Sequence, residues 1–497
     1  MRVFAGVVVA ACALALLALA LFVRDHAYSM YDDAFIYLRY VKIIRAGCGL
    51  RFNCDEAPVE GFSGPLWLLL LVLARSVTAK IVTATQAIGT LAMGATLVAS
   101  TLAATQTHGS SQLNRFPRAA AACAVAGVLA LDHYALLNAV IGLETGLAAL
   151  VGVVAWAAVT AERRKTVFAL SFAMLLLRPE GILLVLGMFV LPWARTRRYV
   201  LAAGGALALV TLVRFAIFHD VVANTVWAKA GGTRRHAALG AFYLLDVMKD
   251  FPAIVLAPFV LRCPGAKHHA RWLLAIATVW LGSFVYSGGD TFSYARLAFP
   301  LVPALTVAAV QGVIAAAARS FAARRTLATL AASAVFFAIG GRAARAHALE
   351  PSHGFGNVDL WTAIGKHLKT HHRGKSVATV PIGAISYFSE AKVLDLVGLA
   401  SREVAKEGRT VPPERLEKNW IGHERHFLEH TLAWAPDIVV TTKFRETAWV
   451  SLDEASAGFW SDWLLLRAAK EGRAPYRVLD LEIAEGVHVL ALGRVLE

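Results

Sequence analysis

Residues 3–40 read VFAGVVVAACALALLALALFVRDHAYSMYDDAFIYLRY, an apolar run from Val3 to Val23 followed shortly by Tyr31-Asp32-Asp33. An apolar run of about 21 residues matches the roughly 20 that a helix needs to cross a bilayer. It exceeds the apolar core of about 7–15 residues in a cleaved secretory signal. We therefore expect a membrane-spanning helix, with two neighbouring carboxylates just beyond its end.

The composition of the whole chain agrees with a membrane protein. Of its 497 residues, 58% are hydrophobic and only 17% are charged, whereas soluble chains carry about 25% charged residues. The formal net charge of +15 comes from basic residues in short clusters between apolar runs. This pattern is typical of cytoplasmic loops, so we expect membrane lipids as a partner and no nucleic acid.

Further apolar runs alternate with polar segments through residue 342. They predict a polytopic α-helical membrane protein with about eleven transmembrane helices, at 3–23, 82–105, 119–137, 146–161, 166–177, 180–194, 199–218, 240–262, 271–286, 295–317 and 326–342. The apolar segment Leu66–Thr78 is read as a helix along the membrane interface, inside a first external loop of residues 24–81.

Loop charge predicts which side each loop faces. One alternate set of loops carries the basic clusters, Arg115 and Arg118, 163–165, Arg195 to Arg198, 262–271 and 319–325, and the positive-inside rule places it in the cytoplasm. The other set carries unusual polar chemistry at Asp32 and Asp33, Glu144, 178–180, 220–232 and 290–296. We therefore expect these polar groups to meet on the extracytoplasmic side.

Residues 343–497 contain no run long enough to span a bilayer and read as an extracytoplasmic α/β domain beyond the transmembrane module 1–342. Short β-branched segments predict strands at 377–380, 437–441 and 487–492. Helical periodicity is seen at 360–369 and 425–433. Cys48 and Cys54 lie close together in the first external loop, where an oxidising compartment permits a disulfide, and pairing is left open.

Asp32 and Asp33 are the first candidates for catalysis. Two carboxylates at a membrane surface are costly to desolvate without a partner or a function. One of them could draw the proton from an acceptor hydroxyl as a general base. Alternatively Asp33 could hold a divalent cation, Mg²⁺ or Mn²⁺, beside a leaving phosphate. A solvated helix N-terminus is the structural alternative.

The other polar loops supply candidate substrate-binding residues. Arg178-Pro179-Glu180 interrupts an apolar stretch, where charges rarely persist without function, although an internal ion pair is the alternative. Cations suit a phosphate and amides suit a sugar. The candidates are Arg39, Glu60, Glu144, Arg178, Glu180, Asn224, Lys229, Asp290, Arg296 and His423.

These motifs, in this order, resemble a known family. The stretches YDDAFIYLRY at 31–40, GLRFN at 49–53, PVEGFS at 58–63, GLET at 142–145, RPEG at 178–181 and GGD at 288–290 are similar to the type-C (GT-C) membrane glycosyltransferases. The resemblance is strongest to the mycobacterial terminal β-arabinofuranosyltransferase and its bacterial relatives. It continues through 382–388, 393–399 and 422–424.

The resemblance implies an enzyme of cell-envelope biogenesis in the bacterial plasma membrane. Its donor would be a polyprenyl-phosphate-linked sugar, with arabinofuranose as the first choice, and its acceptor an extracytoplasmic glycan, lipid or protein. The family's catalytic carboxylates map to Asp32 and Asp33, and its phosphate-facing cations to Arg178, Lys229 or Arg296. A mannosyl, glucosyl or aminoarabinosyl transferase of the same fold is the alternative, and a lipid-linked-sugar flippase is the rival from another class.

Overall fold

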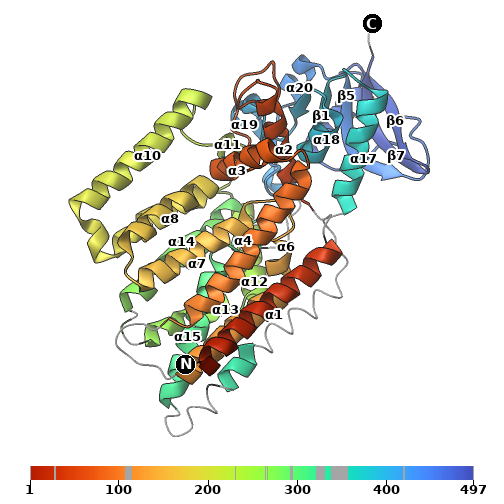
Figure 1. Cartoon of the computed structure of the whole chain (residues 1–497). Coiled ribbons are helices and arrows are strands. Elements are labelled where there is room, and N and C mark those ends of the chain that lie inside the picture. Colours follow the sequence, from red (N-terminus) through yellow and green to blue (C-terminus); the bar gives the residue numbers. More distant parts are fainter. Residues whose placement is uncertain are drawn as a thin grey trace.

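The computed structural model of the chain describes residues 2–26, 30–106, 115–229, 231–263, 265, 267–291, 295–320, 329, 331–336, 356–417 and 420–495. Figure 1 shows a bundle of helices with a sheet-containing unit at one end and the N-terminus at the opposite end. The helices of the bundle run roughly side by side, and α2, α3 and α11 lie where the two parts meet.

The apolar runs fold as helices close to the predicted ranges. The bundle contains α1 (Arg2–His26), α4 (Ile81–Ala104), α5 (Arg115–Leu131), α7 (Thr145–Thr160), α8 (Arg164–Leu177), α10 (Arg197–Phe218), α12 (Arg234–Asp250), α14 (Lys267–Ser287) and α15 (Val302–Ser320). Among the described residues, α1, α4, α10 and α14 are long and apolar enough to cross a membrane. The predicted count of eleven stays a prediction, because 326–342 lies mostly outside the described residues.

Three expected spans are interrupted in the structure. Asp132 caps the short helix α6 (His133–Leu137) by accepting from the Ala135 N–H, so 119–137 is two helices. Range 180–194 breaks into η1 (Pro179–Gly181), α9 (Ile182–Gly187), η2 (Met188–Val190) and η3 (Pro192–Arg195). Range 240–262 breaks after α12, at Pro252, into α13 (Ala253–Leu256) and η4 (Ala257–Arg262). Proline lacks the N–H that would continue a helix.

The first external loop contains two helices. Residues Asp32–Arg45 form a helix, α2, and Pro65–Val77 form α3, which matches the predicted interfacial segment. Ten of the fourteen residues of α2 are buried, although its mean hydropathy is low. Cys48 and Cys54 form a disulfide in the turn that follows α2. The helix therefore lies between the bundle and the sheet-containing unit, not in solvent.

The C-terminal residues 356–495 build a mixed five-stranded sheet in the order β2-β1-β5-β7-β6. Its strands are β1 (Val377–Thr379), β2 (Val393–Asp395), β5 (Ile438–Arg445), β6 (Tyr476–Ala484) and β7 (Val487–Arg494). Strands β2, β1 and β5 are parallel, whereas β7 pairs antiparallel with both β5 and β6. The three predicted strands are thus confirmed, and the predicted helix 360–369 lies within α17 (Gly356–His371).

Other parts of this unit differ from the sequence expectation. Range 425–433 begins as the strand β4 (Arg425–His426), paired with β3 (Arg409–Thr410), and only then becomes α20 (Leu428–Trp434). The helices α18 (Ile382–Ser389), α19 (Arg402–Glu407) and α21 (Trp460–Lys470) were not predicted. Helix α18 packs directly on α2, which joins the sheet-containing unit to the first loop. The predicted domain boundary at 342/343 lies outside the described residues.

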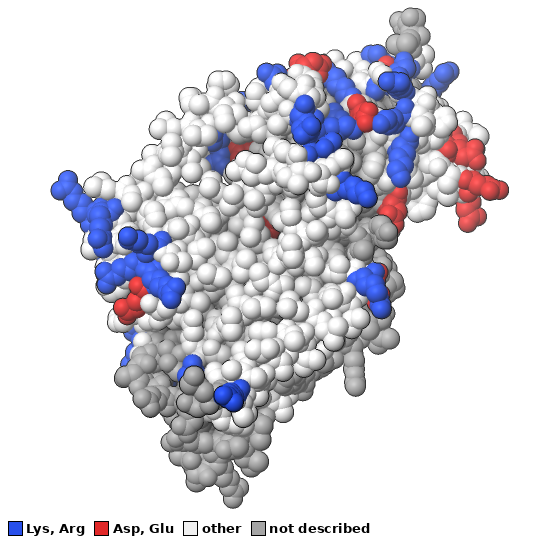
Figure 2. Space-filling view, in the orientation of Figure 1, with Lys and Arg blue, Asp and Glu red and all other residues white. Residues whose placement is uncertain are grey.

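The surface of the bundle is suited to lipid. Figure 2 shows a broad uncharged belt over the bundle. Charged side chains are concentrated on the sheet-containing unit and at the left edge of the view. Helix α10 exposes Leu201, Leu209, Leu212 and Phe215, each more than half exposed. A belt of this kind would be costly in water and is favourable against acyl chains. The chain is therefore a membrane protein, with its sheet-containing unit at one end of the bundle.

Candidate active site

The two adjacent acids of α2 point to different places. Both lie in the first turn of α2, where the helix dipole favours negative charge. Successive helical residues are rotated by about 100°, so neighbouring side chains diverge. Asp33 faces a pocket, whereas Asp32 is buried and accepts hydrogen bonds from the N–H groups of Gly383 (2.9 Å) and Ala384 (2.7 Å). The pair therefore divides into one pocket carboxylate and one that holds α18.

The pocket lies between the bundle, the first loop and the sheet-containing unit, and its volume is about 190 Å³. Its polar and charged lining residues come from segments far apart in the sequence. They are Asp33, Tyr37, Ser63, Glu144, Arg178, Glu180, Thr225, Lys229, Ser287, Asp290, Thr291, Arg296 and His423. Seven of the predicted substrate-binding residues and one of the two predicted catalytic aspartates thus meet in one cavity.

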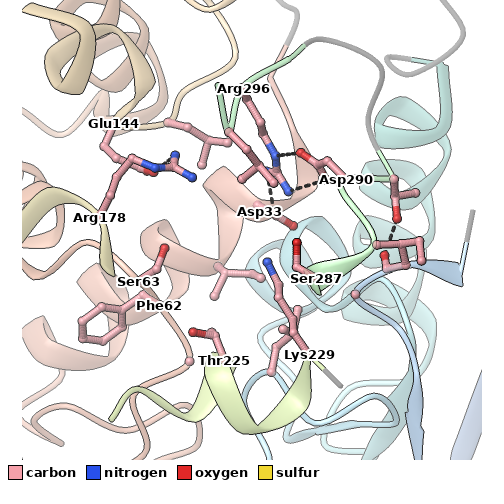
Figure 3. Close-up of a pocket in the computed structure, with 18 of the residues that line it drawn as sticks. Asp33, Phe62, Ser63, Glu144, Arg178, Thr225, Lys229, Ser287, Asp290 and Arg296 are labelled. Carbon is pink, nitrogen blue, oxygen red and sulfur yellow. Dashed lines mark hydrogen bonds and ion pairs between the residues drawn. The ribbon is translucent and has the colours of Figure 1, made fainter. Parts of the chain in front are cut away.

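Arg296 lies between two carboxylates of this pocket (Figure 3). Its Nη1 donates to Asp33 Oδ2 at 2.7 Å, and its Nε donates to Asp290 Oδ2 at 2.7 Å. Burial alone would raise the pKa of Asp33, but the charge and hydrogen bond of Arg296 outweigh it and hold that pKa below its ordinary value. Asp33 is therefore ionised at neutral pH and still one-third exposed (32%) to the cavity.

The loop that carries Asp290 depends on two glycines. Gly288 and Gly289 both have positive φ, at 84° and 86°. A Cβ on Gly289 would lie 2.6 Å from the Tyr243 ring, so only glycine lets this turn close against α12. The turn directs Asp290 back onto Arg296, six residues later.

Arg178 forms a second cluster with two acids on the other wall of the pocket. Its Nη1 donates to Glu144 Oε1 at 2.9 Å, and its Nε lies 3.4 Å from Glu180 Oε2. Arg178 ends α8 in an extended conformation, and Pro179 prevents the helix from continuing. The internal ion pair that was the structural alternative for Arg178 and Glu180 is therefore present. Glu144 also takes part in it.

Lys229 differs from both arginines because no ion pair or side-chain hydrogen bond joins its ammonium to another described residue. It follows the short helix α11 (Asn224–Ala228), and in Figure 3 it points into the pocket toward Asp33 and Ser287. Thr225, one turn earlier, adds a hydroxyl to the same wall. An unpaired ammonium beside hydroxyls is suited to an anionic ligand group.

The sheet-containing unit contributes one wall of the pocket through Ile421, Gly422 and His423. Gly422 has a φ of 82°, and the ring of His423 stacks on Phe459 with centroids 5.5 Å apart. Burial lowers the pKa of the His423 imidazole below its ordinary value. His423 is therefore neutral at physiological pH, and it can donate or accept a hydrogen bond.

Three predicted substrate-binding residues lie outside the pocket lining. Arg39 donates to the carbonyl oxygens of Ser386 and Ala391, and thereby ties α2 to the end of α18. Glu60 accepts two hydrogen bonds from Arg214, at 2.6 and 3.1 Å, and anchors the first loop to α10. Asn224 donates to carbonyl oxygens of the 398–401 loop. Their contact with substrate stays a prediction, and the structure gives each a scaffolding role.

Among the other polar lining residues, Tyr37, Ser63 and Ser287 were not singled out in the sequence. Tyr37 and Ser63 belong to the quoted motifs of the first loop, and these motifs are the signal that could have found them. Ser287 ends α14 directly before the two glycines and carried no such signal.

The four carboxylates of the pocket are all engaged in ion pairs with arginine, so none of them is a free ligand for a divalent cation. Asp33 and Asp290 bind Arg296, while Glu144 and Glu180 lie against Arg178. Among the residues that the structure describes, no group of three His, Cys, Asp or Glu side chains converges as a ligand set. Mg²⁺ is commonly held by one or two carboxylates together with water and substrate phosphate, and here such a carboxylate would first have to leave its arginine partner. No step is therefore assigned to a metal, and the predicted Mg²⁺ or Mn²⁺ stays a prediction.

Comparison with known proteins identifies the fold. A family model described as a domain of unknown function (DUF8728) matches residues 352–479, the greater part of the sheet-containing unit. No curated protein sequence matches the chain. The crystal structure of ArnT from Cupriavidus metallidurans bound to undecaprenyl phosphate superposes with a TM-score of 0.52 at 12% identity, over 99% of this chain and 98% of that one.

The apo state of the same ArnT gives a TM-score of 0.51 at 13% identity, with 98% of each chain covered. At these identities the likeness establishes the fold alone, and it extends over the bundle and the sheet-containing unit together. The chain thus has the fold of ArnT over nearly its whole length, which supports the broad GT-C resemblance and leaves the arabinofuranosyltransferase branch as a prediction.

Proposed function

We propose that this chain is a membrane glycosyltransferase that takes a sugar from a polyprenyl-phosphate donor. The observation that carries the proposal is the charge arrangement of the pocket. Three cations, Arg178, Lys229 and Arg296, share it with four carboxylates, and both arginines are paired with two of these each. Lys229 alone has no carboxylate partner among the described residues.

Lys229 is the pocket cation that is left to face a ligand, while the pocket as a whole holds one more carboxylate than cations, so it suits a ligand with a single negative charge better than one with more. A sugar linked to a lipid through a single phosphate is a phosphodiester and carries one such charge, whereas a diphosphate or a nucleotide sugar carries more. The extra charges of a diphosphate would face Asp33 and Glu180, and like charges at short range are unfavourable in a partly buried site. The pocket therefore favours a lipid monophosphate as the donor.

The size of the pocket suggests which part of such a donor it would bind, the sugar-phosphate head group or the polyprenyl tail. A volume of about 190 Å³ is far too small for a polyprenyl chain, so the pocket would receive the head group of such a donor. The tail would remain among the apolar helices of the bundle, in contact with membrane lipid. ArnT, which shares the fold, has been crystallised with undecaprenyl phosphate, a lipid of this class.

In the proposed reaction, Asp33 acts as the general base. The acceptor hydroxyl oxygen attacks the anomeric carbon as its proton moves to Asp33, and the bond from that carbon to the phosphate oxygen breaks. The phosphate leaves with the bonding electron pair, next to Lys229. Arg296 keeps Asp33 ionised before the step, and a positioned base contributes about 10²–10⁴ in rate.

The sugar and acceptor are the finer part of the proposal. The motif resemblance favours arabinofuranose and an extracytoplasmic glycan, lipid or protein acceptor. Mannosyl, glucosyl and aminoarabinosyl donors of the same phosphate class fit the same charge argument. Purified protein incubated with synthetic polyprenyl-phosphate sugars of these four kinds, plus a cell-envelope glycan extract, would identify the donor by mass spectrometry of the product. If no donor supports transfer, and the protein reconstituted in liposomes instead moves the lipid-linked sugar across the bilayer, the result would favour the flippase.

We further propose that the pocket and sheet-containing unit face away from the cytoplasm. The basic loop at 163–165 and the exposed turn at Glu485 should then lie on opposite sides. Cysteine introduced at Glu485, in a variant without the three unpaired native cysteines, should react with an impermeant maleimide in intact cells, and cysteine at Lys165 should react only after lysis. The reverse labelling pattern would overturn the orientation.

A further inference from the structure

A buried acid–histidine pair lies directly behind the wall of the pocket formed by Ile421–His423. Glu424, which follows this loop, and His236, in the first turn of α12, each have about 1% of their side chains exposed. Glu424 Oε1 accepts from the Gly422 N–H at 2.7 Å and lies 3.5 Å from His236 Nε2. Neither residue lines the pocket, and the proposed reaction does not use them.

The orientation of the His236 ring is fixed from its other side. Thr233 caps α12 by accepting from the His236 backbone N–H, and its hydroxyl lies 2.6 Å from His236 Nδ1. A threonine hydroxyl that donates to Nδ1 leaves the proton of a neutral imidazole on Nε2. In that tautomer Nε2 directs its N–H toward Glu424, with Nε2 and Glu424 Oε1 3.5 Å apart.

His236 also contacts the second loop of the pocket. A Cβ on Gly288 would lie 3.1 Å from the His236 ring and 2.9 Å from Ile421, so this glycine is enclosed by both. Thr291, just beyond Asp290, donates its hydroxyl hydrogen bond to the Ile421 carbonyl oxygen. The loop with Asp290 and the loop with His423 thus meet at His236, one from the bundle and one from the sheet-containing unit.

We propose that Glu424 and His236 are a positioning pair that fixes the Ile421–His423 loop on the bundle, and thereby sets the geometry in which the acceptor meets Asp33. The inference rests on the proposed function and adds two residues that act through the loop. Glu424 holds Gly422, whose positive φ leaves the backbone dependent on its hydrogen bonds. Loss of the carboxylate would free this turn and shift His423 relative to Asp33.

A displacement of this kind should affect turnover more than donor binding. A misplacement of about 1 Å at a reacting centre can reduce a rate by about 100-fold. Glu424→Ala is therefore expected to lower kcat for sugar transfer by about that factor with the KM for the polyprenyl-phosphate sugar unchanged. Glu424→Gln keeps an oxygen for the Gly422 N–H and should stay within about tenfold of wild type. His236→Ala should resemble Glu424→Ala, and the double variant should be no worse than either single one.

Hydrogen exchange measured by mass spectrometry on the full chain in detergent gives a readout that is independent of activity. Glu424→Ala should raise exchange in the peptide that contains Gly422. Asp437→Ala is the matched control, because Asp437 also accepts a backbone hydrogen bond, from Ser376 at 2.9 Å, and does not line the pocket. This control should change neither kcat nor exchange at Gly422.

The outcomes separate this inference from the proposed function. An active wild-type enzyme with equally active Glu424→Ala and His236→Ala variants, or with effects that simply add in the double variant, would overturn the positioning pair. Unchanged exchange at Gly422 in Glu424→Ala would do the same. If the wild-type protein transfers no sugar, but Glu424→Ala still shows faster exchange at Gly422, the proposed transferase function would be overturned. The contact between Glu424 and the Gly422 loop would stand.

Discussion

Arg296 Nη1 lies 2.7 Å from Asp33 Oδ2, and this contact joins two residues that are 263 positions apart in the sequence. Asp290 holds the same guanidinium from the other side. The contact places a permanently charged group on the proposed base, so Asp33 is kept ionised by a partner that cannot itself take up the proton.

Removal of the Asp33 carboxylate should strongly reduce transfer. Asp33→Asn keeps the shape of the side chain but cannot accept the proton of the acceptor hydroxyl, so kcat should fall by about 10²–10⁴. The donor should still bind, because Lys229 is unchanged. Donor binding by isothermal calorimetry and transfer by mass spectrometry would check both parts. Near-normal transfer by purified Asp33→Asn would exclude Asp33 as the base.

The pH dependence of transfer should depend on Arg296. Since Arg296 holds the pKa of Asp33 below its ordinary value, the base becomes protonated only at strongly acid pH. In Arg296→Gln the charge is lost and burial dominates, so the pKa of Asp33 should rise. The acid limb of the kcat/KM profile is then expected to move to higher pH. An acid limb that stays at the same pH in Arg296→Gln would show that Arg296 does not set the pKa of the catalytic base.

Much of this site could be predicted because the sequence indicates which loops lie on the same side of the membrane. Alternation of apolar runs and basic loops placed Glu144, Arg178, Lys229 and Arg296 at one end of the bundle, and there they meet. Helix periodicity and loop charge depend only on local composition, so they are readable without a structure.

The pairing of these residues could not be predicted, because it depends on contacts across hundreds of positions. Nothing near Asp32 in the sequence indicates that its partners are Gly383 and Ala384, and nothing near Asn224 indicates the 398–401 loop. A Cβ on Gly383 would lie 1.9 Å from the Asp32 carbonyl oxygen, so α18 approaches α2 only because this residue is glycine. Such a close approach of two backbones produces no periodic pattern in the sequence.

Lys229 should determine affinity for the donor phosphate. A hydrogen bond to a charged group contributes about 1.5–3 kcal/mol, so Lys229→Ala should raise the KM for a polyprenyl-phosphate sugar by about 10- to 150-fold. Lys229→Arg should restore part of this affinity. Lys392, which pairs with Asp55 outside the pocket, supplies a matched control, and Lys392→Ala should leave the KM unchanged. Equal effects of the two alanine variants would argue against a phosphate site at Lys229.

Transfer should continue without divalent cations. Each of the four pocket carboxylates lies in an ion pair with Arg178 or Arg296, so a metal ion would have to compete with one of these arginines for its ligands. Activity measured after treatment with EDTA and passage over a chelating resin is expected to match that of untreated enzyme. Loss of activity that Mg²⁺ or Mn²⁺ restores would instead give Asp33 the metal-ligand role that its sequence position also allowed.

Asp32 should affect stability in a pH-dependent way. Burial raises the pKa of its carboxyl to about 7, although the Gly383 and Ala384 N–H groups lower it in part. An unfolded aspartate titrates near about 3.9. Between these values the folded state binds more protons than the unfolded state, so the free energy of unfolding should fall as pH rises. This contribution is complete below the unfolded pKa and is lost as pH passes through about 7.

The variant Asp32→Asn has no titrating group at this position, so the part of the pH dependence that comes from Asp32 should disappear. Unfolding midpoints in detergent, followed by tryptophan fluorescence from pH 4 to 8, should decline less steeply for Asp32→Asn than for wild type. The same variant should keep measurable transfer, because its side chain faces α18 and not the pocket, whereas Asp33→Asn should not. If Asp32→Asn instead shows a wild-type pH profile of stability and no transfer, Asp32 shares the catalytic role with its neighbour and α18 is held by other contacts, such as those of Arg39.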